Sequence, residues 1–117
     1  ENIKEKMVNA TSSQTVRSKS RTGKHSRQLQ SAWTDAWESK DAPEPLPMPL
    51  QTMVGEHALA IISKQATLGH EGAKKLDTYW VGQGIGLVNE TISAGQTVQK
   101  FKEEFIEGYE RMNSLFK

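Results

Sequence analysis

Apolar residues recur at helical spacing along most of this chain. Residues 1–10 have the pattern of the end of an amphipathic helix, and 51–68 restart a helix with one apolar side. The closing segment has the clearest pattern, because its apolar residues lie three and four positions apart: Val98, Phe101, Phe105, Tyr109, Met112 and Phe116. Ser93–Gln96 precedes it and has the form of a capping box. The pattern therefore predicts a mostly helical chain.

One short segment has the pattern of a strand. Residues 15–20 are rich in β-compatible side chains and end at Thr22-Gly23, which predicts a strand followed by a turn. Ser26 is a candidate N-cap for a helix, since Leu29, Trp33, Ala36 and Trp37 fall on one face of a 3.6-residue period. One strand cannot make a sheet, so either the strand is wrong or its partners lie outside this chain.

All four prolines lie in one stretch, at positions 43, 45, 47 and 49. Alternating prolines remove every second amide donor and fix φ, so we expect 42–50 to be an extended strap, spanning roughly 28 Å at about 3.1 Å per residue. The strap divides the chain into an N-terminal part, 1–41, and a C-terminal helical segment, 51–117.

The apolar stretch 79–88 carries glycines at 82, 84 and 86. It is not the GxGxxG phosphate loop, and close packing against another backbone is the favoured interpretation. Gln83 is the exception, because a polar side chain inside an apolar stretch needs a hydrogen-bond partner.

Composition excludes several classes of protein. The chain has 117 residues, a net charge of +1 and no cysteine, which excludes disulfides, zinc fingers, iron–sulfur sites and thiol catalysis. The absence of cysteine fits a reducing compartment, so we expect a cytoplasmic protein. No apolar run approaches the length of a membrane span, and we expect no signal peptide ahead of the body. The opening residue is Glu, and we expect a chain that is trimmed or a fragment at its N-terminus.

Candidate catalytic and metal groups are few. The three histidines, His25, His57 and His70, share no ligand spacing, so no metal site is expected. No Ser/His/Asp arrangement is visible either, and no catalytic residue is assigned.

Basic residues are concentrated near the N-terminus. Six basic residues and no acid lie between Glu5 and Asp35. One interpretation is an anion site built from a strand end, a Gly-Lys loop and a helix N-terminus. The other is a solvated basic face or a flexible arm. Nucleic-acid binding is not expected, because Trp33 and Trp37 have the spacing of core residues.

Three stretches, read together, resemble a known family: SRTGKHSRQLQSAWTDAWES, DAPEPLPMPLQ and YWVGQGIGLVNE. They are similar to the C-terminal region of nitronate monooxygenases, formerly called 2-nitropropane dioxygenases, which are FMN-dependent TIM-barrel proteins. The resemblance implies an α/β fold, in which this mostly helical chain with one or two strands is the C-terminal part of an FMN-binding (β/α)8 barrel.

The resemblance also implies a place for each segment. Residues 1–10 would end the seventh barrel helix, 15–20 would be the eighth strand and 26–38 would open the eighth helix, so 1–41 would hold the last βα units. A barrel needs about 250 residues, so the remainder, with the catalytic histidine and the phosphate-binding loops, would lie upstream.

Because strand ends face the active site in such barrels, the resemblance implies a rim around the flavin. Lys24 or Arg27 would attract an anionic substrate, either a nitronate or the phosphates of a CoA thioester. The residues placed near the rim are Ser18, Ser20, Gly23, Lys24, Arg27, Gly82 and Gln83.

The function implied by this resemblance is oxidation of alkyl nitronates with O2 to a carbonyl product and nitrite, with FMN as cofactor. An FMN-dependent enoyl- or acyl-CoA reductase of the same family is an alternative. A third hypothesis, from another class, is a non-enzymatic helical interaction module whose basic arm, 15–27, binds an acidic partner. The expected partners of the enzyme are a small-molecule substrate and the remainder of the barrel, without nucleic acid or membrane.

Overall fold

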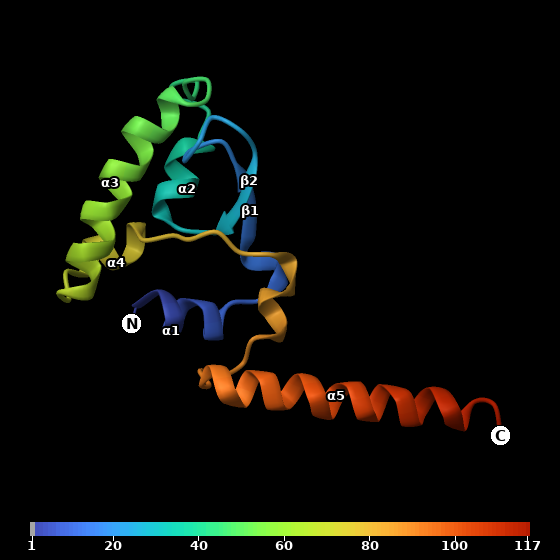
Figure 1. The fold of residues 1–117 in the computed structure, drawn as a ribbon. Coiled ribbons are helices and arrows are strands. Elements are labelled where there is room, and N and C mark those ends of the chain that lie inside the picture. Colours follow the sequence, from blue (N-terminus) through green and yellow to red (C-terminus); the bar gives the residue numbers. More distant parts are fainter. Residues whose placement is uncertain (1) are drawn as a thin grey trace.

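A computed structural model describes residues 2–117 as a small folded body from which one long helix projects (Figure 1). The dimensions are 60 × 30 × 23 Å. The elements follow in the order α1 (Asn2–Asn9), a 3-10 turn η1 (Ser12–Gln14), β1 (Thr15–Ser18), β2 (Ser26–Leu29), α2 (Ala32–Trp37), α3 (Leu50–Thr67), α4 (Glu71–Leu76), a second 3-10 turn η2 (Gln83–Leu87) and α5 (Ala94–Ser114). The chain is therefore mostly helical with two strands, as expected.

The two strands form an antiparallel hairpin in which Thr15 pairs with Leu29 and Ser18 with Ser26. Residues 79–81 run antiparallel along the other edge of β2. The amide of Leu29 donates to the carbonyl of Tyr79 at 3.0 Å, and the amide of Val81 donates to the carbonyl of Arg27 at 3.2 Å. The segment after α4 is thereby tied to β2, about fifty residues earlier in the sequence.

The predicted helix from Ser26 is wrong over its first turn and a half. Ser26–Leu29 is strand β2, and the helix starts at Ala32 with Ser31 as its N-cap. The backbone of 26–29 finds hydrogen-bond partners on both sides, in β1 and in 79–81, which outweighs the helical spacing of Leu29 and Trp33. The predicted strand is real, and the expectation that its partners all lie outside this chain is also wrong.

The other helices lie where the apolar spacing places them. α3 begins at Leu50 and packs against α4, and α5 begins after the predicted capping box. The amide of Gln96 donates to Ser93 Oγ at 3.3 Å, and the amide of Ser93 donates to Gln96 Oε1 at 2.9 Å. These two bonds satisfy donors that a helix start leaves free.

The buried interior is more polar than apolar. The buried apolar residues are Leu29, Leu59, Ala66, Ala73 and Ile85. Nine polar or charged residues of the described range 2–117 are buried as well, and Ser18, Ser20, Gln28 and Thr34 are completely inaccessible. Many large apolar side chains are exposed instead, along α3 and α5 above all. In 2–117 no helix has the length and apolar character to cross a membrane.

Candidate functional site

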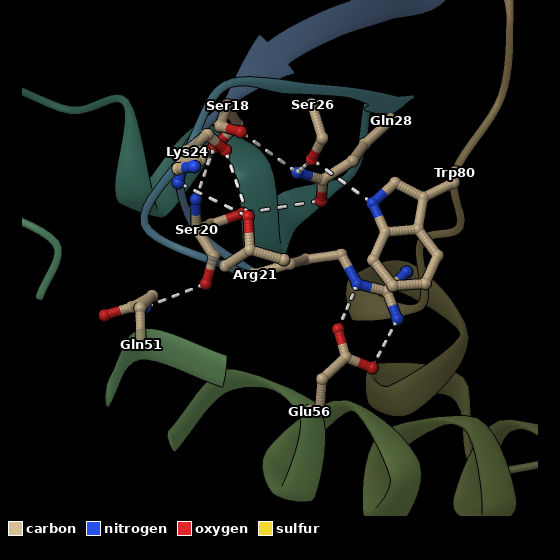
Figure 2. A network of polar contacts seen from close by, with 10 residues as sticks. Ser18, Ser20, Arg21, Lys24, Ser26, Gln28, Gln51, Glu56 and Trp80 are labelled. Carbon is tan, nitrogen blue, oxygen red and sulfur yellow. Dashed lines mark hydrogen bonds and ion pairs between the residues drawn. The ribbon is translucent and has the colours of Figure 1, made fainter. Parts of the chain in front are cut away.

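A buried polar network closes the inner side of the β1–β2 hairpin (Figure 2). Ser20 Oγ donates to Gln28 Oε1 at 3.4 Å, and the backbone amide of Ser20 donates to Ser18 Oγ at 3.1 Å. Gln28 Nε2 donates to the carbonyl of Ser18 at 3.4 Å and to Ser26 Oγ at 3.3 Å. Since the side chains of Ser18, Ser20 and Gln28 are inaccessible to solvent, the network satisfies polar groups that would otherwise be costly to bury.

Arg21 is held from three sides beside this network (Figure 2). Its side chain is only 5% exposed, and its Nε and Nη2 donate to the two carboxylate oxygens of Glu56 at 2.6 and 2.7 Å. The guanidinium carbon lies 3.7 Å from the ring centre of Trp80 and 5.6 Å from that of Tyr79. Trp80 is fixed in turn, because its Nε1 donates to Ser26 Oγ at 3.2 Å. A bidentate ion pair and a cation–π contact thus join the hairpin, α3 and the segment at 79–81.

The proline strap is locked over the hairpin turn. Gly23 has φ +81°, and a Cβ built on it would lie 2.9 Å from the amide nitrogen of Met48. Gln51 is 1% exposed and uses both ends of its amide: Nε2 donates to the carbonyl of Ser20 at 2.8 Å, and Oε1 accepts from the amide of Leu46 at 3.0 Å. The turn, the strap and the start of α3 therefore hold one another.

α3 lies close to the hairpin at a second point. A Cβ on Gly55 would lie 2.9 Å from the carbonyl oxygen of Ser20 and 3.2 Å from that of Arg21. Only a residue without a side chain lets the helix axis approach the backbone this closely.

Three of the predicted rim residues are structural in this chain. Ser18 and Ser20 are 0% exposed in this chain, and their place at the rim of a barrel stays a prediction. They point into the polar network, because the strand alternation and the turn direct them inward. Gly23 lies under the strap, where positive φ and close approach require glycine.

Lys24 and Arg27 have different surroundings. Lys24 is exposed at the hairpin turn, beside Thr22, and is available to an anion. Arg27 is half-buried, and its Nη1 donates to Thr15 Oγ1 at 2.8 Å across the hairpin. The interpretation of 15–27 as a flexible basic arm is wrong, because this segment is a hairpin that uses Arg21 and Arg27 in internal contacts.

Gly82 and Gln83 lie away from the hairpin, at the start of η2. Both are exposed, and Gln83 opens η2, which packs against η1. A Cβ on Gly86 would lie 2.9 Å from the amide nitrogen of Ser12, so the favoured interpretation of close backbone packing is confirmed at this glycine. Gln83 does not need the buried partner that we expected, because its side chain lies in solvent.

Two hollows lie near charged side chains. The smaller, about 220 Å³, lies beside the hairpin turn and is lined by Lys19, His25, Trp37, Glu38, Glu44 and Pro45. The larger, about 430 Å³, lies beside α1 and includes Lys6, whose Nζ donates to the carbonyl of Asp77 at 2.6 Å. Burial lowers the pKa of Lys6 from its ordinary value, although the nearby Asp77 carboxylate acts in the opposite direction.

The histidines and acids do not assemble a metal site. No group of three His, Asp or Glu side chains within 2–117 is arranged to hold a metal ion. The ring of His70 instead caps α4, since its Nδ1 accepts from the amide of Ala73 at 3.2 Å.

The predicted rim residues do not form a cradle for FMN by themselves. A flavin phosphate needs free backbone amides, but the amide of Gly23 donates to the carbonyl of Lys19 at 2.9 Å. The hydroxyls of Ser18 and Ser20 are engaged inside the network. Of this set, Lys24 is the cation that remains open to an anionic ligand.

Sequence reasoning missed the residues that build this region, namely Arg21, Gln51, Glu56 and Trp80. Arg21, Gln51 and Trp80 lie within stretches that carry the family resemblance, but the resemblance assigns no role to them. One signal was present: Glu56 is the single acid in the apolar helix α3, and an isolated acid on such a helix often has a basic partner.

Comparison with known proteins gives one match. The chain is 42% identical over 113 residues to a protein of Mycobacterium tuberculosis described as "Putative monooxygenase Rv1533". The match includes 97% of this chain but spans only 30% of the length of that protein. No family model matches the chain, and no solved structure matches it significantly. The chain is therefore similar to about a third of a larger protein that is described as a monooxygenase.

Proposed function

We propose that this chain is the C-terminal part of a flavin-dependent oxidoreductase that oxidises alkyl nitronates with O2 to a carbonyl product and nitrite. The observation that carries the proposal is the 42% identity, over almost the whole chain, to a protein described as a monooxygenase. The choice of alkyl nitronates as substrate and of FMN as cofactor rests on the three stretches that resemble nitronate monooxygenases.

In this proposal the FMN site and the catalytic groups belong to the part of the protein outside this chain. FMN would supply the electron transfer between the nitronate and O2. The chain itself contributes a rigid support, because Arg21, Gly23 and Gln51 lock the hairpin turn against the strap and α3. The exposed Lys24 on that turn is then held in a fixed place, where its positive charge would attract an anionic substrate.

The test uses the intact protein as its gene encodes it, purified and supplied with FMN. We expect retention of FMN through gel filtration and release of nitrite when an alkyl nitronate and O2 are added. The reductase alternative would be favoured by two results together. An enoyl-CoA would reoxidise the bound, reduced flavin, and a nitronate would give no nitrite. A protein that retains no flavin would overturn the proposal.

A further inference from the structure

The projecting helix α5 carries a long apolar surface without a partner in the described part of the chain (Figure 1). Each of its large apolar side chains is at least half exposed. We call the following six residues, the last of which lies just past the end of the helix, the α5 stripe: Val98, Phe101, Phe105, Tyr109, Met112 and Phe116. Exposed apolar surface of this extent on one face marks an interaction site.

The spacing of the α5 stripe departs from the strict heptad of a two-stranded coiled coil. Within α5 the stripe runs from Val98 to Met112 in steps of three, four, four and three residues, an average of 3.5. A coiled coil with a second copy needs the same average in strictly alternating steps of three and four. Gly108 stands where that heptad would need a large apolar residue, and Tyr109 lies one position beyond. A second copy of α5 is therefore a poor occupant.

The charge of α5 disfavours a lipid surface as well. The helix contains three basic residues and four acids, whereas helices that lie on membranes are rich in Lys and Arg on their polar face. The start of α5 is also fixed to the preceding segment, because Lys100 forms an ion pair with Glu90.

We propose that the α5 stripe docks into an apolar groove on the portion of the same monooxygenase-like protein that lies outside this chain. This inference rests on the proposed function only in taking the chain as part of a longer protein. The matched protein supplies the occupant, since most of its length has no counterpart in this chain. Phe101, Phe105 and Tyr109 are the expected anchors, because aromatic side chains at the centre of an interface contribute most of its binding energy.

Photo-cross-linking in the protein as its gene encodes it tests this directly. Phe105→p-benzoylphenylalanine should give an intramolecular cross-link to a peptide outside residues 1–117, identified by mass spectrometry. The matched control is the same substitution at Glu107, on the opposite face of α5, which should give several-fold less of that product. A cross-link to α5 of a second copy, or no cross-link although circular dichroism shows an intact fold, would overturn the inference.

Flavin content separates this inference from the proposed function. The expected cross-link in a protein that binds no flavin would support the docking surface and contradict the proposed activity. Nitrite release by a flavoprotein that gives no cross-link from Phe105 would support the activity and contradict the docking surface.

Discussion

Arg21 shows, at the scale of single residues, how this chain stabilises a polar interior. Its guanidinium lies between the Glu56 carboxylate and the Trp80 ring, almost out of contact with water. Taking a cation out of water is costly, so the contact with Glu56 is needed for the fold rather than added to it. The ion pair between Lys19 and Glu44 is exposed and longer. The Glu44 side chain is 85% exposed, and its charged atom lies 3.6 Å from that of Lys19.

We therefore predict that Glu56→Ala lowers the free energy of unfolding by about 3 kcal/mol, because it leaves Arg21 buried without its counter-charge. Glu44→Ala is the matched control and should change it by less than about 0.5 kcal/mol. Urea unfolding followed by tryptophan fluorescence measures both. Equal effects of the two substitutions would show that the Arg21 pair is not the constraint described here.

A second prediction at the scale of residues concerns the substitution of Gly23. Gly23 and Gly69 both have positive φ, at +81° and +94°, but only Gly23 lies against other backbone atoms. Gly69→Ala should cost about 1–2 kcal/mol from backbone strain alone. Gly23→Ala should cost about 3 kcal/mol or more, because its Cβ would also meet the strap. Thermal unfolding of the two variants compares them, and a Gly23→Ala variant no less stable than Gly69→Ala would contradict the strap contact.

At the scale of elements, the sequence predicted the helices well and the hairpin poorly. α3 and α5 were predictable because their apolar faces and the capping box at Ser93 are local signals. Strand β2 was not, because its partners are β1 and the segment around Trp80, and the second lies some fifty residues away. Pairing between distant segments leaves little trace in a local pattern, and Leu29, Trp33 and Trp37 happen to have helical spacing.

The contact between α3 and the hairpin gives a prediction about elements. Gly55 and Gly108 both lie inside long helices, but a Cβ on Gly55 would meet the carbonyl of Ser20, whereas a Cβ on Gly108 would have no described atom within 4 Å. In the 117-residue chain, Gly108→Ala should raise stability by roughly 0.5–1 kcal/mol, because alanine favours helix. Gly55→Ala should lower it, since α3 must move away from the hairpin. Urea unfolding gives the sign of each change, and stabilisation by Gly55→Ala would contradict the close approach.

At the scale of the whole molecule, the chain has a small apolar core and wide apolar surfaces. Leu29, Leu59 and Ile85 are buried, while α5 exposes an entire face. This balance agrees with the match to less than a third of a longer protein. The barrel, its FMN and the division of the chain at 42 and 51 stay predictions.

Only part of the candidate site was predictable at this scale. The turn predicted at Thr22-Gly23 is present, because glycine after a strand is a local signal, and Lys24 lies exposed beside it. The sequence could not show that Ser18 and Ser20 turn inward, because their burial depends on Gln28 and on the approach of α3. Gln51 illustrates the same limit, as its two hydrogen bonds join residues 46 and 20.

We propose that the protein containing this chain transfers electrons from a nitronate through a bound flavin. The most direct test is the visible absorption spectrum of the intact, FMN-loaded protein, mixed with an alkyl nitronate in the absence of O2. We expect the bands of oxidised flavin to fall on mixing and to return when O2 is admitted, with nitrite released. A spectrum that stays unchanged on mixing, with flavin still bound, would contradict it.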